Sequence, residues 1–241
     1  MGDGAGEPVT PDRAAWLLSL RRANELQEDE LDPTYDDEWG EISDTHRRFV
    51  ERFVSELPAD GRILDAACGT GKYFGIVLAS GRLVVGVDQS RAHLATGRDK
   101  HPEAIVQQHD LQDLPFRDEF DGVMCVDAME FVPPEDWPGI LKRFRQALHA
   151  RGWLYLTVEL LRGERVREMN AEARRSGLPV VEGEVIFDGP DGYYHHYPTM
   201  QQVGAWITDA GFAIEEETEG PWQEEGYAYH HVLARVEAPS G

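Results

Sequence analysis

From about residue 61 onward, short apolar runs alternate with stretches in which apolar residues recur at helical spacing. The apolar runs predict strands over 62–67, 83–88, 104–109, 120–126 and 152–159, and the stretches between them predict helices over 72–80, 91–100 and 134–149. Apolar strands separated by helices indicate an α/β fold with a parallel, doubly wound sheet. Right-handed crossovers would align the carboxyl ends of these strands along one edge, where ligands bind in such folds.

The segment before residue 61 shows helical periodicity and no strand pattern. It predicts a helix from about residue 10 to 31, a polar, aromatic loop over 33–40, and a second helix from Ser43 to Leu57. Thr10 suits the cap of the first helix and Pro11 its first turn. We therefore expect residues 1–9 to be a disordered tail and residues 10–60 to form an N-terminal helical cap.

The pattern changes again after residue 160. It predicts a charged helix over 162–176, a hairpin formed by 180–188 and 192–197, a helix over 199–210, and two final strands over 212–218 and 227–236. A lid insertion at about 160–198 would then follow the fifth strand of a domain that covers 61–236. The expected sheet has seven strands, mostly parallel, with an antiparallel terminal strand, and residues 237–241 form a tail.

Composition excludes several classes of protein. The 241 residues are 41% hydrophobic, but no apolar run reaches the roughly 18 residues that a membrane span needs. The acidic N-terminus has no basic and apolar signal-peptide regions, so we expect a cytoplasmic protein with no membrane partner. A net charge of −22 disfavours nucleic acid as a partner. The two cysteines, Cys68 and Cys125, fall at the ends of buried strands and read as free thiols.

The first predicted strand ends in a glycine-rich turn, Asp65-Ala-Ala-Cys-Gly69-Thr-Gly71. Such a turn lets the backbone approach a ligand closely and leaves amides at a helix N-terminus free. Ala66 and Tyr73 break the pattern of a phosphate-binding P-loop. Phe74 stands where a dinucleotide-binding turn has its third glycine, which makes a nicotinamide oxidoreductase a weak alternative.

The remaining pattern, an acid followed four and six residues later by glycines, resembles motif I of the class I S-adenosylmethionine (SAM)-dependent methyltransferases. Other segments resemble later motifs of that family at the expected intervals. They are Asp88 after the second strand, 109–111 after the third, 120–127 as the fourth motif, 151–157 entering strand five, and 193–212 before the sixth strand. The resemblance covers about residues 61–236.

The resemblance implies SAM as the cofactor, with S-adenosylhomocysteine (SAH) as the product. Asp88 would accept hydrogen bonds from both ribose hydroxyls and Asp110 would face the adenine amine, although Asp110 could simply cap the next turn. The implied cofactor-binding residues are Tyr35, Asp65, Ala67, Gly69, Thr70, Gly71, Asp88, Gln89, Asp110, Leu111 and Val126.

Substrate and catalytic residues are expected beyond strand four and in the lid. The candidates for substrate contact are Trp39, Asp127, Glu130, Tyr194, Tyr197 and His230. Asp127 and Glu130 could equally cap the turn, and the lid aromatics could be packing. His195 and His196 are candidate bases, with His195 preferred, and a base is required only for a hydroxyl or a protonated amine. We expect no metal, because adjacent strand histidines cannot chelate one ion.

The sequence lacks the flanks of an Asn/Asp-Pro-Pro-aromatic motif around Pro133-Pro134 and lacks a paired-glutamate loop, so methyltransferases of nucleic-acid bases and of protein arginine are disfavoured. The resemblance then implies methyl transfer to an O, N or C nucleophile of a small molecule, natural products included, by a monomer or homodimer. Two alternatives stay open: a SAM-binding enzyme with another reaction, such as a cyclisation, and a non-catalytic SAM-binding module.

Overall fold

The computed structural model describes residues 12–28, 35–161, 163–187, 192–221 and 227–237. The tail predicted over 1–9 and residues 238–241 of the C-terminal tail lie outside the described residues, as do Thr10 and Pro11. Among the described residues, no helix combines the length and apolarity needed to cross a bilayer.

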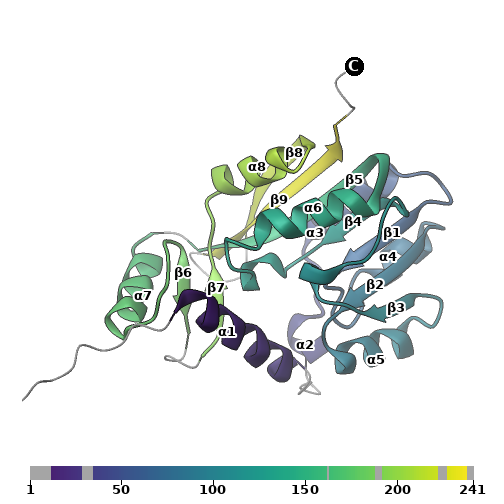
Figure 1. The fold of residues 1–241 in the computed structure, drawn as a ribbon. Coiled ribbons are helices and arrows are strands. Elements are labelled where there is room, and N and C mark those ends of the chain that lie inside the picture. The colour runs from purple at the N-terminus through teal and green to yellow at the C-terminus, as the bar shows by residue number, and fades with distance from the viewer. Residues whose placement is uncertain (1–11, 29–34, 162, 188–191, 222–226, 238–241) are drawn as a thin grey trace, which may run out of the picture.

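A seven-stranded sheet forms the centre of the molecule (Figure 1). Its strands are β1 (Arg62–Ala66), β2 (Leu83–Asp88), β3 (Ile105–Gln108), β4 (Phe120–Cys125), β5 (Leu148–Leu161), β8 (Phe212–Pro221) and β9 (Tyr227–Val236). The order across the sheet is β3-β2-β1-β4-β5-β9-β8. The five strands from β3 to β5 are parallel, and β9 runs antiparallel to both β5 and β8. The predicted fold class is therefore confirmed.

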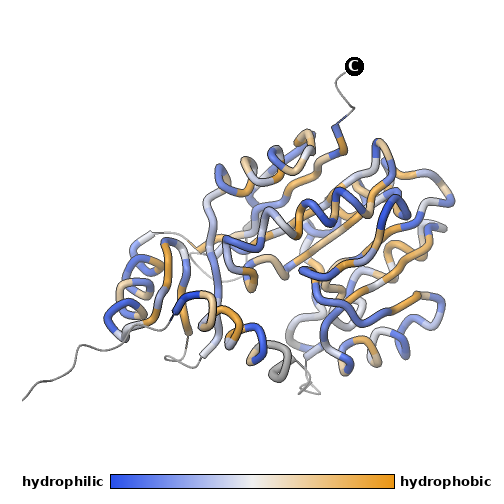
Figure 2. Tube along the Cα trace, in the orientation of Figure 1, coloured by the Kyte–Doolittle hydropathy of each residue, from blue (hydrophilic) through white to orange (hydrophobic). Residues whose placement is uncertain are grey.

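Helices cover both faces of the sheet, as a doubly wound fold requires. One face packs on α6 (Trp137–Ala147) and α8 (Met200–Asp209), with Trp137, Phe144 and Ile207 in the same buried cluster as strand residues. The other face packs on α3 (Asp44–Ser55), α4 (Phe74–Ala79) and α5 (Arg91–Lys100). Hydropathy follows this layering, since hydrophobic residues run along the central strands and the surrounding helices alternate (Figure 2).

A smaller unit lies at one end of the molecule (Figure 1). It contains α1 (Arg13–Glu28), α7 (Glu164–Arg175) and the two-stranded sheet of β6 (Glu184–Ile186) and β7 (Tyr194–His196). Trp16 of α1 shares a small apolar cluster with Ala173, Val180 and Tyr194. The predicted cap therefore divides in two, because α1 packs on the lid whereas α3 belongs to the main core.

Several boundaries differ from the sequence prediction. The loop predicted over 33–40 is wrong in part, since Tyr35–Trp39 forms a short helix, α2. β5 begins at Leu148 rather than 152 and extends to Leu161, because β9 pairs with it along its whole second half. Two 3₁₀ turns, η1 (Leu111–Asp113) and η2 (Met129–Phe131), follow β3 and β4, where only loops were expected.

Candidate active site

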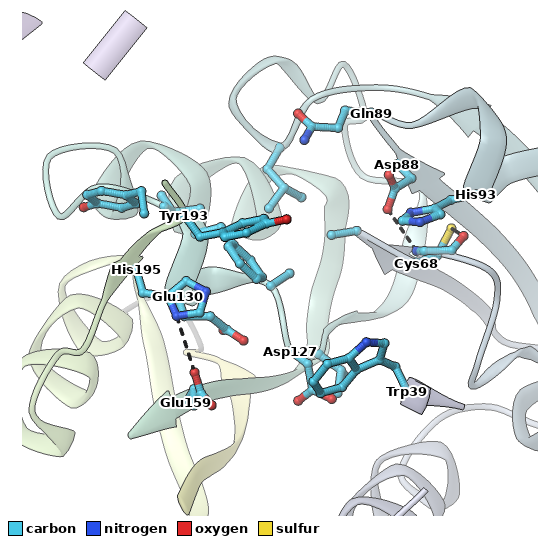
Figure 3. A pocket seen from close by; sticks show the side chains of 18 of the residues that line it. Trp39, Cys68, Asp88, Gln89, His93, Asp127, Glu130, Glu159, Tyr193 and His195 are labelled. Atoms are coloured by element: carbon cyan, nitrogen blue, oxygen red, sulfur yellow. Dashed lines mark hydrogen bonds and ion pairs between the residues drawn. The ribbon is translucent and has the colours of Figure 1, made fainter. Parts of the chain in front are cut away.

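A cavity of about 680 Å³ opens at the carboxyl ends of β1, β2 and β4. This volume lies within the range of about 300–1,000 Å³ typical of small-molecule sites. The glycine-rich turn and the residues after β2 and β3 line one half, which we call the cofactor half. Residues after β4, at the end of β5 and in the lid line the other, which we call the acceptor half (Figure 3).

The glycine-rich turn has an unusual backbone. Ala67, Gly69 and Gly71 all have positive φ angles, of 61°, 51° and 78°. This left-handed region suits glycine but costs an L-residue roughly 1–2 kcal/mol, so Ala67 holds a strained conformation beside the cavity. A backbone hydrogen bond holds the turn against β2, because the Cys68 amide donates to the Val87 carbonyl oxygen at 2.9 Å.

Phe74 explains why the third glycine of a dinucleotide turn is missing. Its ring is fully buried against two glycines, so that a Cβ added at Gly71 or Gly86 would lie 2.6 Å and 2.3 Å from the ring atoms. In a dinucleotide-binding turn, the third glycine lets the helix approach the sheet closely. Here the Phe74 ring occupies that space.

Asp88 joins the turn to β2. Its two carboxylate oxygens accept hydrogen bonds from the Gly69 and Ser90 amides, each at 2.9 Å. Asp110 caps η1, since its Oδ1 accepts from the Gln112 amide at 2.8 Å. Both aspartates also line the cavity. The capping role that the sequence left open for Asp110 is thus present, and it leaves the residue facing the ligand space.

Asp65 is a buried side chain of the cofactor half that lacks a hydrogen-bond partner at one oxygen within the part of the chain that the structure describes. The side chain is 1% exposed, and its Oδ2 has no hydrogen-bond partner among the described residues. Burial and the nearby Asp88 raise the pKa of Asp65 to about 8. A buried carboxyl without a partner is costly unless a ligand supplies a donor or a positive charge. The ammonium group that SAM carries on its methionine part fits this requirement.

Helix α2 lies over the same half. Asp36 accepts hydrogen bonds from the Thr70 hydroxyl at 2.6 Å and from Lys100 Nζ at 2.9 Å, which fastens the helix to the turn and to α5. The Tyr35 ring lies 4.8 Å from the ring of His93. Trp39, at the end of α2, is 52% exposed and lines the cavity (Figure 3).

Asp127 is held by a network that the sequence did not reveal. Its Oδ1 lies 3.0 Å from His46 Nε2 and accepts from the Thr157 hydroxyl at 2.8 Å, while its backbone amide donates to Thr157 Oγ1. Burial alone would raise the pKa of Asp127, but His46, Lys72 and Thr157 outweigh it and lower that pKa. Asp127 is therefore an ionised, well-partnered group on the boundary between the two halves.

Glu130, Glu159 and His195 meet in the acceptor half (Figure 3). Glu130 is 3% exposed, and burial together with Glu159 and Asp127 raises its pKa well above the usual value. His195 Nδ1 lies 2.9 Å from the Tyr197 hydroxyl and 3.8 Å from Glu159 Oε2. Burial lowers the pKa of His195 to about 4, which leaves the imidazole neutral at neutral pH.

The lid is fastened to α1 by one buried ion pair. Arg13 donates to both carboxylate oxygens of Glu184, at 2.7 and 2.9 Å, and also to Glu135. The Glu184 side chain is fully buried, and it accepts a further hydrogen bond of 2.6 Å from the Tyr194 hydroxyl. This cluster positions Tyr194, whose ring lines the cavity.

Most predicted site residues line the cavity. They are Tyr35, Asp65, Ala67, Gly69, Thr70, Asp88, Gln89, Asp110, Leu111 and Val126 in the cofactor set, Trp39, Asp127, Glu130, Tyr194 and Tyr197 in the substrate set, and His195. Gly71 does not, because it faces Phe74.

Two of the predicted histidines do not line the cavity. His196, the last residue of β7, is 1% exposed and packs beside Gly183 instead. The buried side chain of His230 points from β9 toward Glu217 Oε2, 2.9 Å away.

Sequence reasoning missed Glu159, His46 and Lys72. Glu159 carried a usable signal, because it is a lone carboxylate in the apolar run 152–161, at the carboxyl end of a parallel strand. His46 and Lys72 carried none, since only the tertiary fold brings them to Asp127. Among the described residues, no group of three or more His, Cys, Asp or Glu side chains is placed to hold a metal ion.

Residues 63–152 match a family model described as a methyltransferase domain. A dTDP-3-amino-3,6-dideoxy-alpha-D-glucopyranose N,N-dimethyltransferase from Streptomyces fradiae is 25% identical over 212 residues, which cover 76% of this chain and 83% of that protein. A tRNA (carboxymethyluridine(34)-5-O)-methyltransferase from Arabidopsis thaliana is 31% identical over 126 residues, which cover 50% of this chain but only 30% of that protein.

The fold is similar to that of solved methyltransferases. The Burkholderia thailandensis 1,6-didemethyltoxoflavin-N1-methyltransferase, solved with its substrate and SAH, aligns with a TM-score of 0.69 at 15% identity, over 97% of this chain and 94% of that one. The family match over residues 63–152, the sheet order and the ordered motif residues agree: this chain contains a class I SAM-dependent methyltransferase domain.

Proposed function

We propose that this enzyme transfers the methyl group of SAM to a small-molecule acceptor enclosed by the lid. The observation that carries the proposal is the single cavity that joins the motif residues Gly69 and Asp88 to the lid residues Tyr194 and His195. A donor in one half and an acceptor in the other would then be held side by side. Such alignment is the main contribution that a protein makes to an in-line displacement.

In the cofactor half, each residue has a fitting role. Asp88 keeps both oxygens at the mouth of the turn, where they can accept from ribose hydroxyls while the Gly69 and Ser90 amides orient them. Asp110 would accept from the adenine amine, and Asp65 would pair with the ammonium group. When bound, SAM supplies an activated methyl group on a positively charged sulfur.

In the acceptor half, His195 is the proposed base. The Tyr197 hydroxyl is hydrogen-bonded to Glu159, so His195 Nδ1–H donates to Tyr197 and Nε2 keeps a lone pair for a proton. A neutral imidazole beside the cavity can accept the proton that a hydroxyl or amine acceptor loses. Phe131, Phe187 and the lid tyrosines line this half, and a bound acceptor packed against them would displace water from the reacting groups.

A small molecule is favoured over RNA as the acceptor. The net charge of −22 opposes binding of a phosphate backbone, and residues of α1 and the lid line the acceptor half. The Streptomyces relative, which aligns over most of both chains, acts on a nucleotide-linked amino sugar by its name. The tRNA-modifying relative aligns over half of this chain.

Calorimetry with SAM and SAH tests the cofactor assignment. We expect dissociation constants below about 100 μM, and we expect Asp88→Ala to weaken SAH binding by about 10- to 100-fold, because charged hydrogen bonds of roughly 1.5–3 kcal/mol are lost. Asp60→Asn, an exposed substitution before β1, is the control. Failure of both ligands to bind more tightly than about 100 μM, or an unchanged affinity in Asp88→Ala, would refute the proposal.

Product analysis separates methyl transfer from another SAM-dependent reaction. We expect mass spectrometry to show an acceptor heavier by one CH₂ together with an equal amount of SAH. We expect His195→Gln to lower turnover by about 100-fold or more while SAH affinity is kept, and His196→Gln to leave the pH profile of turnover unchanged. A cyclised product without added CH₂ contradicts methyl transfer.

A further inference from the structure

The acceptor half contains two carboxylates that the methyl donor does not need. Glu130 lies on η2 and Glu159 on β5, and both line the cavity. Glu130 is 97% removed from solvent, and its Oε2 has no hydrogen-bond partner among the described residues. Figure 3 shows its side chain between His195 and Asp127, directed toward the cavity interior. A buried, unpartnered acceptor at a ligand site indicates a ligand that donates.

Backbone amides of Glu130 and Glu159 hydrogen-bond the Glu130 carboxyl group, but the described side chains supply no positive charge to it. No ion pair to Glu130 occurs among them, and Lys72, which lines the same cavity, lies 3.9 Å from Asp127 instead. Arg13 forms ion pairs with Glu184 and Glu135. His195 stays neutral, because burial lowers its pKa to about 4. A cationic donor on the ligand would therefore supply what the site lacks.

Aromatic rings surround these carboxylates. Phe131 and Phe187 lie edge-on to the His195 ring, with centroids 4.7 and 5.1 Å away. Tyr197 and Tyr229 line the same space. A carboxylate inside aromatic walls is an arrangement that favours an organic cation, since the faces of the rings attract positive charge and the carboxylate pairs with it. The strongly acidic surface would also attract cations toward the cavity.

We propose that the acceptor is an amine, bound as an ammonium ion by Glu130 with its carbon body against Phe131, Phe187 and Tyr197. This inference rests on the proposed function and specifies its substrate class. Glu130 is a binding residue for the nitrogen, Glu159 supports His195, and His195 takes the proton.

The reaction balances with these groups. The ammonium nitrogen gives one proton to His195 Nε2, and the resulting imidazolium is stabilised by Glu159, 3.8 Å from Nδ1. The nitrogen lone pair then forms a bond to the methyl carbon, and the carbon–sulfur bond breaks with its electron pair remaining on sulfur. The products are an N-methylammonium ion, SAH and one proton, which leaves His195 for solvent.

The test compares matched amines and alcohols on the full-length protein saturated with SAH. The probes are phenethylamine against 2-phenylethanol and cyclohexylmethylamine against cyclohexylmethanol, measured by calorimetry. We expect at least one amine to bind about tenfold or more tightly than its alcohol, as a charged pair in a desolvated site predicts. Neither amine binding more tightly than its alcohol overturns the inference. SAH binding in the same sample shows separately whether the proposed function holds.

The variant Glu130→Gln tests whether Glu130 is the residue that causes the preference for amines. We expect this variant to lose the amine preference while alcohol and SAH affinities stay within about twofold, and the exposed lid substitution Glu172→Gln to change none of them. An amine preference that survives in a folded Glu130→Gln protein overturns the role of Glu130.

A permanently charged probe gives a readout that needs neither turnover nor a variant. Glu130 is faced by Glu159, Asp127, His195, Tyr197 and Tyr229, and burial with the neighbouring carboxylates raises its pKa, so a cation bound beside it should lower that pKa. N,N,N-trimethylphenethylammonium has no proton to lose, so its binding should release protons from the protein. Calorimetry in two buffers of different ionisation enthalpy measures that release, and binding without proton release contradicts the proposal.

Discussion

The two halves of the cavity are built in different ways. The cofactor half comes chiefly from residues 65–112, which follow one another along β1, β2 and β3, and its key contacts are backbone amides of the turn. The acceptor half draws on α1, η2, the end of β5, the lid and β9. Its main fastening, between Arg13 and Glu184, joins residues 171 positions apart.

This difference predicts how each half responds to change. Contacts between neighbouring turns of one sheet edge form whenever the sheet forms, so the cofactor half should persist as long as the fold does. The acceptor half depends on contacts between side chains that lie far apart in the sequence. Each of these contacts therefore contributes a large part of the stability of this half. Substitutions should therefore separate the two halves.

The largest expected effect is that of Arg13→Ala. It leaves the Glu184 carboxylate buried without its cationic partner, which should lower the free energy of unfolding by about 3–5 kcal/mol in urea titrations. SAH affinity in the folded variant should stay near the wild-type value, whereas amine binding should be lost. Arg22→Ala, on an exposed face of α1, is the control, and Arg13→Ala/Glu184→Gln should recover part of the loss. A parallel fall in SAH affinity would mean that the halves are not separable.

A smaller effect is expected at the turn. Gly71→Ala forces a φ of 78° on an L-residue and places its Cβ 2.6 Å from the Phe74 ring, so the free energy of unfolding should fall by about 1–3 kcal/mol. Gly139→Ala, in α6 with no atom within 4 Å of the added Cβ, should instead stabilise the protein by about 0.4–1 kcal/mol. Equal effects of the two substitutions would contradict the assigned strain.

Asp65 should make the free energy of unfolding depend on pH. Its pKa is raised to about 8 in the fold from a normal value near 3.8, so the folded chain holds a proton that the unfolded chain releases. Stability from this group is complete below pH 4 and falls by up to about 1.4 kcal/mol per pH unit as pH rises toward 8.

Asp65→Asn should remove that fall, so the difference in unfolding free energy between the two proteins should change with pH between 4 and 8. Saturating SAM should flatten the wild-type curve, because the ammonium group compensates the carboxylate. A difference that is constant with pH would refute the raised pKa.

The sequence predicted the cofactor half well because its determinants are local. An acid, two glycines and a second acid follow one another along two neighbouring strands, so the resemblance to the family's motifs could indicate Asp65, Gly69 and Asp88 together, and all three line the cavity. Short apolar runs and helical spacing of apolar residues likewise predicted the strands and most helices. The antiparallel terminal strand was expected from the resemblance to the family, whereas the order β5-β9-β8 is seen only in the structure.

The acceptor half was less accessible for a physical reason. Which of two adjacent strand histidines faces a cavity depends on register, and one step of register separates His195 from His196. The link between His46 and Asp127 spans 81 residues and has no periodic signature. Short helices such as α2 are equally hard to foresee, because α2 is fastened by tertiary bonds from Thr70 and Lys100 to Asp36 rather than by its own propensity.

The lid enters the chain at one place, between the end of β5 at Leu161 and the capping residue Thr199 of α8. Evolution or a protein engineer can therefore exchange it at two junctions without interrupting any pairing of the seven-stranded sheet. Exchange would replace Tyr194, His195 and Tyr197 together and leave Glu159 on its strand as a fixed anchor. The enzyme is thus a natural scaffold for grafting, in which one recombination step can alter the choice of acceptor while the methyl donor stays the same.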